Sequence, residues 1–486
     1  METIKLTRDV PVIEGYDVLV AGGGPAGSAA AICAGRLGAR VLLVEAAGCL
    51  GGMCTSGLVT NFGPMSDGER PLVGGFTREL IESLHARDML GPDVNPTYWM
   101  ADYNRKIQFK PEGLKRALDE YAVNANVDIL FFTRVVDAMV EGRRVKGAIV
   151  ANVEGLSFVR AKAFIDATGD AVLADACGAP CVVAGRDWPH APATLCSLHG
   201  GIDWDDPRYG TGTKGMDKVH KQVKDEFLPK AIADGHFTAP DLTIMGMKKI
   251  GYTVAALNAG QMFELNGLSA WEVSRGMIAG RKLAVEYAEF YRKYVPGCEQ
   301  IQLLTTAPVL GVRDTRRIIG EFELTMEDYS ARRQFPDQVA VYNRPPNVHP
   351  TDASQEEAKR HRSEMDEDLV RLRRGECVGL PYSILVPKDW ENLWVAGRCH
   401  SSETMVHGSI RAQSAAFMMG EAAATAAKQS LDTGQPACDL DTMTLVGTLR
   451  ARGGYLPQTS LSRTMTRSGA RSEERRQSAL AQHGAP

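Results

Sequence analysis

Two short apolar runs near the start of the chain enclose a glycine turn and a helical pattern. Residues 16–21 and 40–45 are rich in Val and Leu, which is typical of buried parallel strands. Between them, residues 22–24 are all glycine and predict a turn. Residues 25–37 predict a helix, because proline is favoured at the first helical position. The segment is therefore predicted to be a strand–turn–helix–strand unit.

The glycine turn has the spacing G-x-G-x-x-G, in which the first glycine allows the turn and the second lets the backbone approach a pyrophosphate. The third glycine lets helix and strand pack closely, and the N–H groups that begin the helix favour an anion. The residues of this motif are Gly22, Gly24, Pro25, Ala26 and Gly27. Glu45 ends the second strand at about the spacing of an acid that binds a ribose hydroxyl. Together they predict a dinucleotide site, against the plainer interpretation of a glycine-rich turn in an ordinary βαβ unit.

The rest of the chain alternates between clear elements and irregular stretches. We expect helices over residues 111–124, over 269–294 with a capping box at Ser269 and Glu272, and in an alanine-rich segment that ends near residue 430. We expect a β-meander over 128–132, 135–140, 145–152 and 157–161, and buried strands at 163–167 and 392–396.

At 486 residues the chain is too long for one compact core, so two domains are expected. We predict an α/β fold with a discontinuous Rossmann-type cofactor domain that includes the meander, and an inserted mixed α+β substrate domain. The cofactor domain covers residues 1–60, 111–180 and 377–456, the substrate domain covers 61–110 and 181–376, and 457–486 form a polar tail that we expect to be disordered.

Composition narrows the choice of partners. A formal net charge of −4 gives no reason to expect nucleic acid or an anionic membrane, and no apolar run is long enough to span a bilayer. The polar N-terminus lacks the apolar core of a signal peptide, and the ten scattered cysteines fit a reducing cytoplasm. No Cys or His spacing predicts a metal site. A small-molecule substrate is the expected partner, and a homo-oligomer is left open.

Several separated motifs resemble the FAD-dependent oxidoreductase family of the glutathione-reductase-type flavoprotein fold, which also contains fumarate reductase-like proteins. The dinucleotide fingerprint, the glycine loop at residues 51–55, the turn at 167–170, the arginine-rich segment 311–317 and the pair 392–398 with 407–411 carry the resemblance. It implies non-covalent FAD, bound by the fingerprint residues and Glu45. The further cofactor-binding residues that it implies are Gly51, Gly52, Met53, Thr55, Val135, Ala167, Thr168, Gly169, Asp170, Gly397, Arg398, Gly408, Ser409 and Ile410.

The chain contains no second unit of this kind for NAD(P)H. Residues 210–215 also read G-x-G-x-x-G, but the polar stretch before them does not predict a strand. We therefore expect hydride transfer between flavin N5 and a small substrate such as a hydroxy acid or a sugar-like alcohol. The electrons then pass to oxygen, a quinone or a carrier protein. Cys49 and Cys54 keep a disulfide-exchange alternative open.

Four residues are candidates for the chemistry. His407, and after it His400, is the candidate base for the substrate proton, against the interpretation that each merely caps a loop. Arg313 and Arg411 are candidates for holding a carboxylate or hydroxyl-rich substrate, with structural ion pairs as the plainer interpretation. Two alternatives stay open for the whole protein: a reductase of an activated C=C bond, and a binding protein of this fold without catalysis.

Overall fold

The computed structural model describes residues 3–5, 7–92, 94–100, 106–206, 208, 221–238, 245–352 and 372–457. Its centre is a five-stranded parallel sheet in the order β21-β10-β2-β3-β6. The strands are β2 (Val18–Ala21), β3 (Val41–Val44), β6 (Val127–Leu130), β10 (Ala163–Asp166) and β21 (Leu393–Val395). Strands from both ends of the chain thus share one sheet, as the predicted discontinuous Rossmann-type domain requires.

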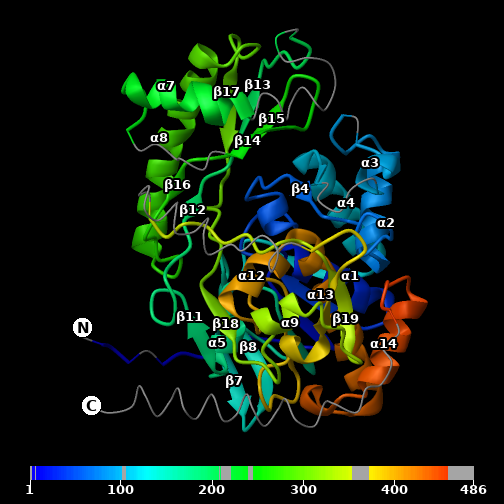
Figure 1. The fold of residues 1–486 in the computed structure, drawn as a ribbon. Coiled ribbons are helices and arrows are strands. Elements are labelled where there is room, and N and C mark those ends of the chain that lie inside the picture. The colour runs from blue at the N-terminus through cyan, green and yellow to red at the C-terminus, as the bar shows by residue number, and fades with distance from the viewer. Residues whose placement is uncertain are drawn as a thin grey trace, which may run out of the picture.

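Helices cover one face of this sheet, and their apolar side chains form the largest hydrophobic cluster (Figure 1). They are α1 (Pro25–Arg36), α2 (Gly75–Ala86), α4 (Pro111–Asn124), α13 (Gln413–Thr433) and α14 (Thr442–Ala451). The bounds of α4 agree with the sequence prediction, and those of α1 differ by one residue. Proline at the first position of both helices accounts for these starts, since its missing N–H has no partner there in any case.

The alanine-rich helix α13 packs directly against α1. A Cβ added to Gly420 would lie 2.0 Å from the carbonyl oxygen of Ala26, so only glycine allows this approach. The alanines of α13 from Ala422 to Ala427 are buried in the same contact region. The small side chains that the sequence shows in this helix therefore serve close helix–helix packing.

The other face of the sheet carries a second cluster, formed with the meander and α5 (Val172–Ala176). The meander sheet has the order β1-β9-β8-β7, in which β7, β8 and β9 pair antiparallel and β1 pairs parallel with β9. Its strands are β1 (Val12–Ile13), β7 (Arg134–Glu141), β8 (Arg144–Asn152) and β9 (Gly155–Val159). The prediction that residues 128–132 begin the meander is wrong, because β6 pairs parallel with β3 in the central sheet. A short apolar strand gives no sign of which neighbour it pairs with.

The second domain lies beyond one end of the cofactor half, at the top of Figure 1, and contains a four-stranded antiparallel sheet in the order β14-β15-β13-β17. Its elements are β13 (Ser197–Gly200), η3 (Val223–Phe227), α7 (Leu228–Ala233), β14 (Met245–Lys249), β15 (Ala255–Asn258), α8 (Ala270–Tyr294) and β17 (Gln302–Thr306). Ser269 caps α8 by accepting from the Glu272 N–H, as predicted, whereas the Glu272 carboxylate accepts from the N–H of Asn266 instead of completing the box.

Two antiparallel strand pairs connect the second domain to the first. They are β11 (Cys181–Val183) with β18 (Arg316–Ile318), and β12 (Ala193–Thr194) with β16 (Gln261–Met262). The remaining elements are η1 (Gly52–Cys54), β4 (Asn61–Phe62), α3 (Pro96–Met100), β5 (Ile107–Gln108), α9 (Met326–Ser330), β19 (Gln338–Tyr342), β20 (Val378–Pro381), η4 (Tyr382–Leu385), α12 (Thr404–Ile410) and η5 (Ala437–Asp439).

The sequence predicts that the segment 61–110 belongs to the substrate domain. In the structure many of its apolar side chains, including Phe62, Phe76 and Phe109, join the cluster that contains α1 and α13. The domain boundaries stay a prediction, but this packing places the segment against the cofactor half.

Two predictions fall outside the described residues: the rejected glycine motif at 210–215 and the disordered tail from 458 onward. Among the described helices, none is long and apolar enough to cross a membrane.

Candidate functional site

The glycine turn after β2 lies at the carboxyl end of the parallel sheet, where α1 begins. Gly22 has a φ of +92°, and a Cβ added to it would lie 2.7 Å from the carbonyl oxygen of Ala167. A Cβ on Gly27 would lie 1.7 Å from the Gly22 carbonyl oxygen. At Gly24, in contrast, the nearest atom would be 4.0 Å away. The crowded glycines therefore pack the turn, and Gly24 leaves open the side from which a pyrophosphate would approach.

Two further features of this turn fit a nucleotide. Helix α1 begins at Pro25 without a side-chain cap, so the N–H groups of its first turn have no intrahelical partner. Glu45, directly after β3, accepts hydrogen bonds from the backbone N–H groups of Gly23 (2.6 Å) and Ala47 (2.6 Å). Burial raises the pKa of the Glu45 carboxyl, and these two bonds oppose the rise. The acid is thereby fixed beside the turn.

The glycine loop after β3 packs directly on the turn. The Gly51 N–H donates to the carbonyl oxygen of Gly23 (2.8 Å), and a Cβ on Gly52 would lie 2.8 Å from the Gly24 Cα. The Thr55 hydroxyl donates to the Leu50 carbonyl (2.6 Å). Thr55 therefore fixes the loop from inside, while Met53, the next residue after Gly52, reaches the cavity described below.

The turn after β10 is fixed by a buried carboxylate. Asp166 is fully buried and accepts from the N–H (3.0 Å) and the hydroxyl (2.7 Å) of Thr168. Its other oxygen accepts from the N–H of Ala174 in α5 (2.9 Å). This arrangement holds residues 167–170 next to Gly22.

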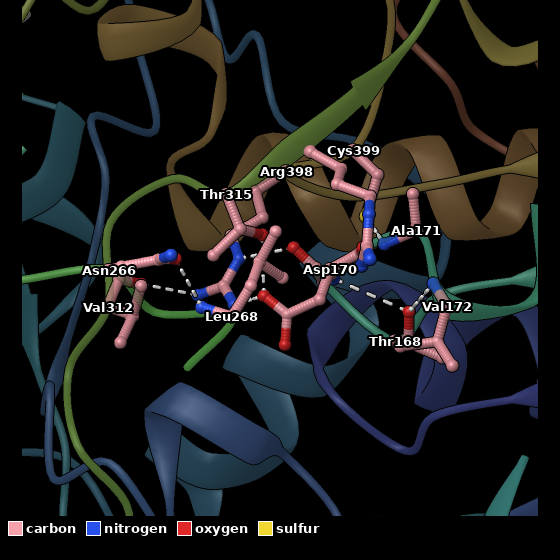
Figure 2. Close-up of polar contacts among 12 residues, drawn as sticks. Thr168, Asp170, Ala171, Val172, Asn266, Leu268, Val312, Thr315, Arg398 and Cys399 are labelled. Atoms are coloured by element: carbon pink, nitrogen blue, oxygen red, sulfur yellow. Dashed lines mark hydrogen bonds and ion pairs between the residues drawn. The ribbon is translucent and has the colours of Figure 1, made fainter. Parts of the chain in front are cut away.

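Arg398, which follows β21, ties this turn to the loop before β18 (Figure 2). Its guanidinium donates to the carbonyl oxygen of Gly169 (2.5 Å) and to Asp170 (2.5 Å), and also to the carbonyl oxygen of Val312. The hydroxyl of Thr315 donates to the same Asp170 carboxylate (2.7 Å). Arg398 and Asp170 are thus structural partners that connect the cofactor half to the arginine-rich segment.

The remaining predicted cofactor residues lie in three separate places. A Cβ on Gly397 would lie 3.1 Å from the Ala26 Cβ, so this glycine lies at the start of α1. Val135 is buried in the meander cluster. Residues 408–410 lie in α12 and pack beneath the segment 344–348, where the Ser409 hydroxyl donates to the Arg344 carbonyl. The helix whose start reaches the cavity is instead α13, through Ala412 and Gln413.

A cavity lies between the glycine loop, the start of α13 and the second domain. Its lining comes from many separate chain segments and includes two predicted cofactor residues. The lining residues are Met53, Val59, Asn61, Gly63, Lys106, Thr194, Cys196, Asn258, Gly311, Val312, Arg313, Arg344, Asn347, His349, Arg398, Arg411, Ala412 and Gln413. Five of these carry a positive charge, and among the described residues that line the cavity none is Asp or Glu. The cavity is therefore strongly cationic.

The positively charged side chains of the lining differ in their contacts, and Arg398 is ion-paired with Asp170. Arg411 donates to the carbonyl oxygen of Asn347 (3.0 Å), and Arg313 donates to the carbonyl of Pro192 and the hydroxyl of Thr194 (3.0 Å). Within the described chain, the guanidinium of Arg344 has no hydrogen bond or ion pair. Burial, and then the neighbouring arginines, lowers the pKa of Arg411 to about 9. An anion in the cavity would relieve this repulsion.

Lys106 is a lining residue that the sequence analysis missed. It directly precedes β5, which pairs with β4 and so brings Lys106 beside Gly63. Burial, and then the charges of Arg344 and Lys248, lowers its pKa to about 8. Its ammonium therefore exchanges protons near neutral pH.

The structure does not bring the two predicted histidines into this cavity. His400 is fully buried, with Nδ1 donating to the Gly397 carbonyl (2.7 Å) and Nε2 bonded to the Ser402 hydroxyl (3.0 Å). His407, in α12, donates from Nε2 to the Arg398 carbonyl (2.8 Å). Burial lowers the pKa of His400 to about 4 and that of His407 well below its usual value. Both are neutral and bonded to loop backbone, so their role as base stays a prediction without support from geometry.

The thiols show no redox pair. All ten cysteines are free, and burial raises the pKa of the Cys54 thiol well above its ordinary value. Cys49 contacts the Ser56 hydroxyl (3.2 Å) instead of Cys54. Because the thiolate is the reactive form, this arrangement gives no support to disulfide exchange.

Comparison with known proteins decides the family. The sequence profile of the family described as FAD dependent oxidoreductase matches residues 17–449. The chain belongs to this family. A search of curated proteins finds no significant match.

Solved structures that resemble this FAD-dependent oxidoreductase share little sequence with it. A geranylgeranyl bacteriochlorophyll reductase-like protein from Thermoplasma acidophilum has 14% identity and a TM-score of 0.43, covering 92% of this chain and 85% of its own. The flavin-dependent brominase Bmp2 has 13% identity and a TM-score of 0.45, covering 90% and 83%. The p-nitrophenol 4-monooxygenase PnpA from Pseudomonas putida has 12% identity and a TM-score of 0.41, covering 96% and 93%. Likeness at this level carries no argument about the reaction.

The cofactor of this family is FAD, and the residues present fit it. The open side of Gly24, the uncapped start of α1 and the fixed Glu45 carboxylate supply what an adenine dinucleotide needs. Met53 and Arg398, which the sequence predicts to contact the cofactor, both line the cationic cavity.

Proposed function

We propose that this FAD-dependent oxidoreductase transfers hydride between its flavin and a small organic anion, such as a hydroxy acid, held in the cationic cavity. The supporting observation is the convergence of Lys106, Arg313, Arg344 and Arg411 on a space whose described lining contains no carboxylate. Electrons then pass to oxygen or a carrier instead of NAD(P)H, since only one dinucleotide unit is found in the sequence.

The hydrogen bonds of Arg313, Arg411 and Arg344 give these three side chains different proposed roles in binding the anion. Arg313 is held in place by two bonds to the second domain, and Arg411 by one bond to Asn347, so each presents a fixed guanidinium. Arg344 has its full set of donors available for a ligand. A planar guanidinium binds a carboxylate through two parallel bonds, which orients the acid as well as attracting it. Arg344 is therefore the proposed carboxylate anchor.

Orientation determines which substrate hydrogen faces the cofactor. FAD, when bound, supplies the two-electron acceptor for hydride. The protein holds the substrate's carboxylate at the arginines, so that the neighbouring carbon points toward the part of the cavity lined by Met53 and Gly311.

The test is anaerobic bleaching of the bound flavin with a panel of lactate, glycerate, malate, glycerol, glucose, alanine and succinate. We expect bleaching by one or more of the hydroxy acids and none by the neutral alcohols. Oxalate, which lacks an oxidisable hydrogen, should perturb the flavin spectrum on binding. Bleaching by glycerol or glucose in preference to the acids would refute the anionic substrate class.

Substitutions of Arg344 test whether its positive charge binds the anion, as distinct from an effect on the fold. Arg344→Gln should weaken oxalate binding by about 10- to 100-fold, because a charge-assisted bond contributes about 1.5–3 kcal/mol. Arg344→Lys should recover part of the loss, since it restores the charge without the planar fork. Arg281→Gln is the matched control, because Arg281 is exposed on α8, away from the cavity lining. Equal losses in the control would show that the effect is not specific to the cavity.

A second candidate is a reductase of an activated C=C bond, since an unsaturated acid is also an anion and Lys106 is mostly protonated at neutral pH. Reoxidation of photoreduced enzyme by fumarate, but not by oxygen, would favour it. Non-covalent attachment of FAD stays a prediction, and acid precipitation should release free FAD if it is correct.

A further inference from the structure

We infer that Lys106 is the proton-transfer residue of the cavity, accepting the hydroxyl proton of the anionic substrate as its carbon loses hydride. This inference rests on the proposed function and names a catalytic residue for it. The step is balanced as follows: the O–H proton goes to Lys106 Nζ, and the C–H hydrogen leaves with its electron pair for the oxidised flavin. The alcohol carbon becomes a carbonyl carbon, so the hydroxy acid loses two electrons and the cofactor gains them.

The placement of Lys106 supports this role first. It directly precedes β5, whose pairing with β4 brings Lys106 beside Gly63, and Asn61 and Gly63 line the same cavity. Arg344 and Arg411, the proposed carboxylate partners, line that cavity as well. A substrate whose carboxylate contacts the arginines therefore has its hydroxyl within the space that Lys106 also lines.

The other side chains that line the cavity are less suitable as the base than Lys106. A base for an alcohol must exchange its proton near the working pH. The pKa of Arg411, about 9, stays above that of Lys106, about 8, and burial raises the pKa of the Cys196 thiol to about 12. His400 and His407 lie outside the lining, which leaves Lys106 and His349.

The charges around Lys106 support it third. Arg344 and Lys248 act directly on its ammonium, and Arg313, Arg398 and Arg411 share the cavity. Like charges and burial both favour the neutral amine, which is the form that accepts a proton. Binding of a carboxylate neutralises part of this field, so the ammonium that forms on proton transfer is stabilised when substrate is present.

The kinetic test uses Lys106→Arg, which keeps the positive charge but holds its proton at all working pH values. With whichever of lactate, glycerate and malate bleaches the flavin fastest, we expect the anaerobic reduction rate to fall about 10²- to 10⁴-fold. The wild-type kcat/KM should rise about tenfold per pH unit below pH 8 and level off above it, and the variant should lose this bend. Lys146→Arg, an exposed lysine in the meander, is the matched control and should match the wild type.

A second measurement does not depend on turnover. Competitive acetylation of Lys106, followed by peptide mass spectrometry across pH 6–11, reports the titration of its amine directly. We expect half-reaction near pH 8 in the free protein and at higher pH with oxalate bound. Oxalate affinity in Lys106→Arg should stay within about threefold of wild type.

The outcomes separate the two proposals. Failure of oxalate to bind the wild type would sink the proposed function. Oxalate binding together with a normal reduction rate in Lys106→Arg would overturn the assignment of Lys106 and leave the anion site intact. Loss of rate in His349→Asn with an unaffected Lys106→Arg would pass the role to His349.

Discussion

Replacing Gly420 by alanine should force α1 and α13 apart. The added Cβ would lie 2.0 Å from the Ala26 carbonyl oxygen, whereas real Cβ contacts are essentially never below 3.0 Å, so the helices must separate by about 1 Å. The obstacle is backbone, which cannot rotate away as a side chain can. Overpacking of a core costs about 1–3 kcal/mol, and a 1 Å gap forfeits roughly a quarter to a half of each nearby dispersion contact. We therefore expect Gly420→Ala to lower the free energy of unfolding by about 2–3 kcal/mol.

The same substitution should also affect FAD binding, because Ala26 belongs to the first turn of α1. Gly420→Ala should lower the thermal midpoint of the apoprotein by several degrees and weaken FAD binding, measured by the fluorescence of released FAD. Gly447→Ala is the control: Gly447 lies in α14 with no atom within 4 Å of its Cβ position. Gly447→Ala should raise the free energy of unfolding by about 0.4–1 kcal/mol. An apoprotein of Gly420→Ala that melts at or above the wild-type midpoint would refute the close packing of these two helices.

Three other substitutions have expected outcomes. Ser269→Ala removes the α8 cap and should cost about 1 kcal/mol in denaturant unfolding, and Ser269→Gly much less. Asp170→Asn leaves the Arg398 guanidinium without its anion. Because both side chains are partly exposed, we expect a loss of about 1–3 kcal/mol, and a neutral result would show that the pair contributes nothing. Lys106→Met should raise the thermal midpoint at pH 7, where the folded protein carries a half-buried charge at this position. The pKa of Lys106 is lowered to about 8, so its folding penalty fades as pH rises from 8 toward 10.5, and a midpoint difference that does not shrink over that window would contradict the shift.

The cofactor half could be predicted largely because its signals are local. Proline at the helix start, the glycine spacing and the runs of Val and Leu fixed α1, α4 and the strands within one or two residues. Strand pairing could not be predicted in the same way. β6 joins the central sheet instead of the meander because a four-residue strand pairs with whichever edge the tertiary structure offers.

The substrate cavity could be predicted only in part. Arg313 and Arg411 were found because they lie in arginine-rich or glycine-rich segments with a family resemblance, and both line the cavity. Lys106 and Arg344 carry no such local signal, since one precedes a two-residue strand and the other follows β19. Their importance comes from long-range contact, which spacing along the chain does not encode. The histidines were misleading for a different reason, because a polar residue in a turn often bonds the backbone of that turn.

The paired strands β11 and β18 have a consequence for how this protein could change its substrate. Cys181 lies opposite Ile318, so everything between these positions leaves and re-enters the cofactor half at one point. In covalent terms much of the second domain is one long loop, which can be exchanged or reshaped without cutting the central sheet. Yet Lys106, Arg344 and Arg411 lie outside that loop, while Arg313, Thr194 and Cys196 lie within it. Replacement of the loop would therefore alter the shape and size of the acids that fit and could remove the charge of Arg313, but it would leave Lys106, Arg344 and Arg411 in place.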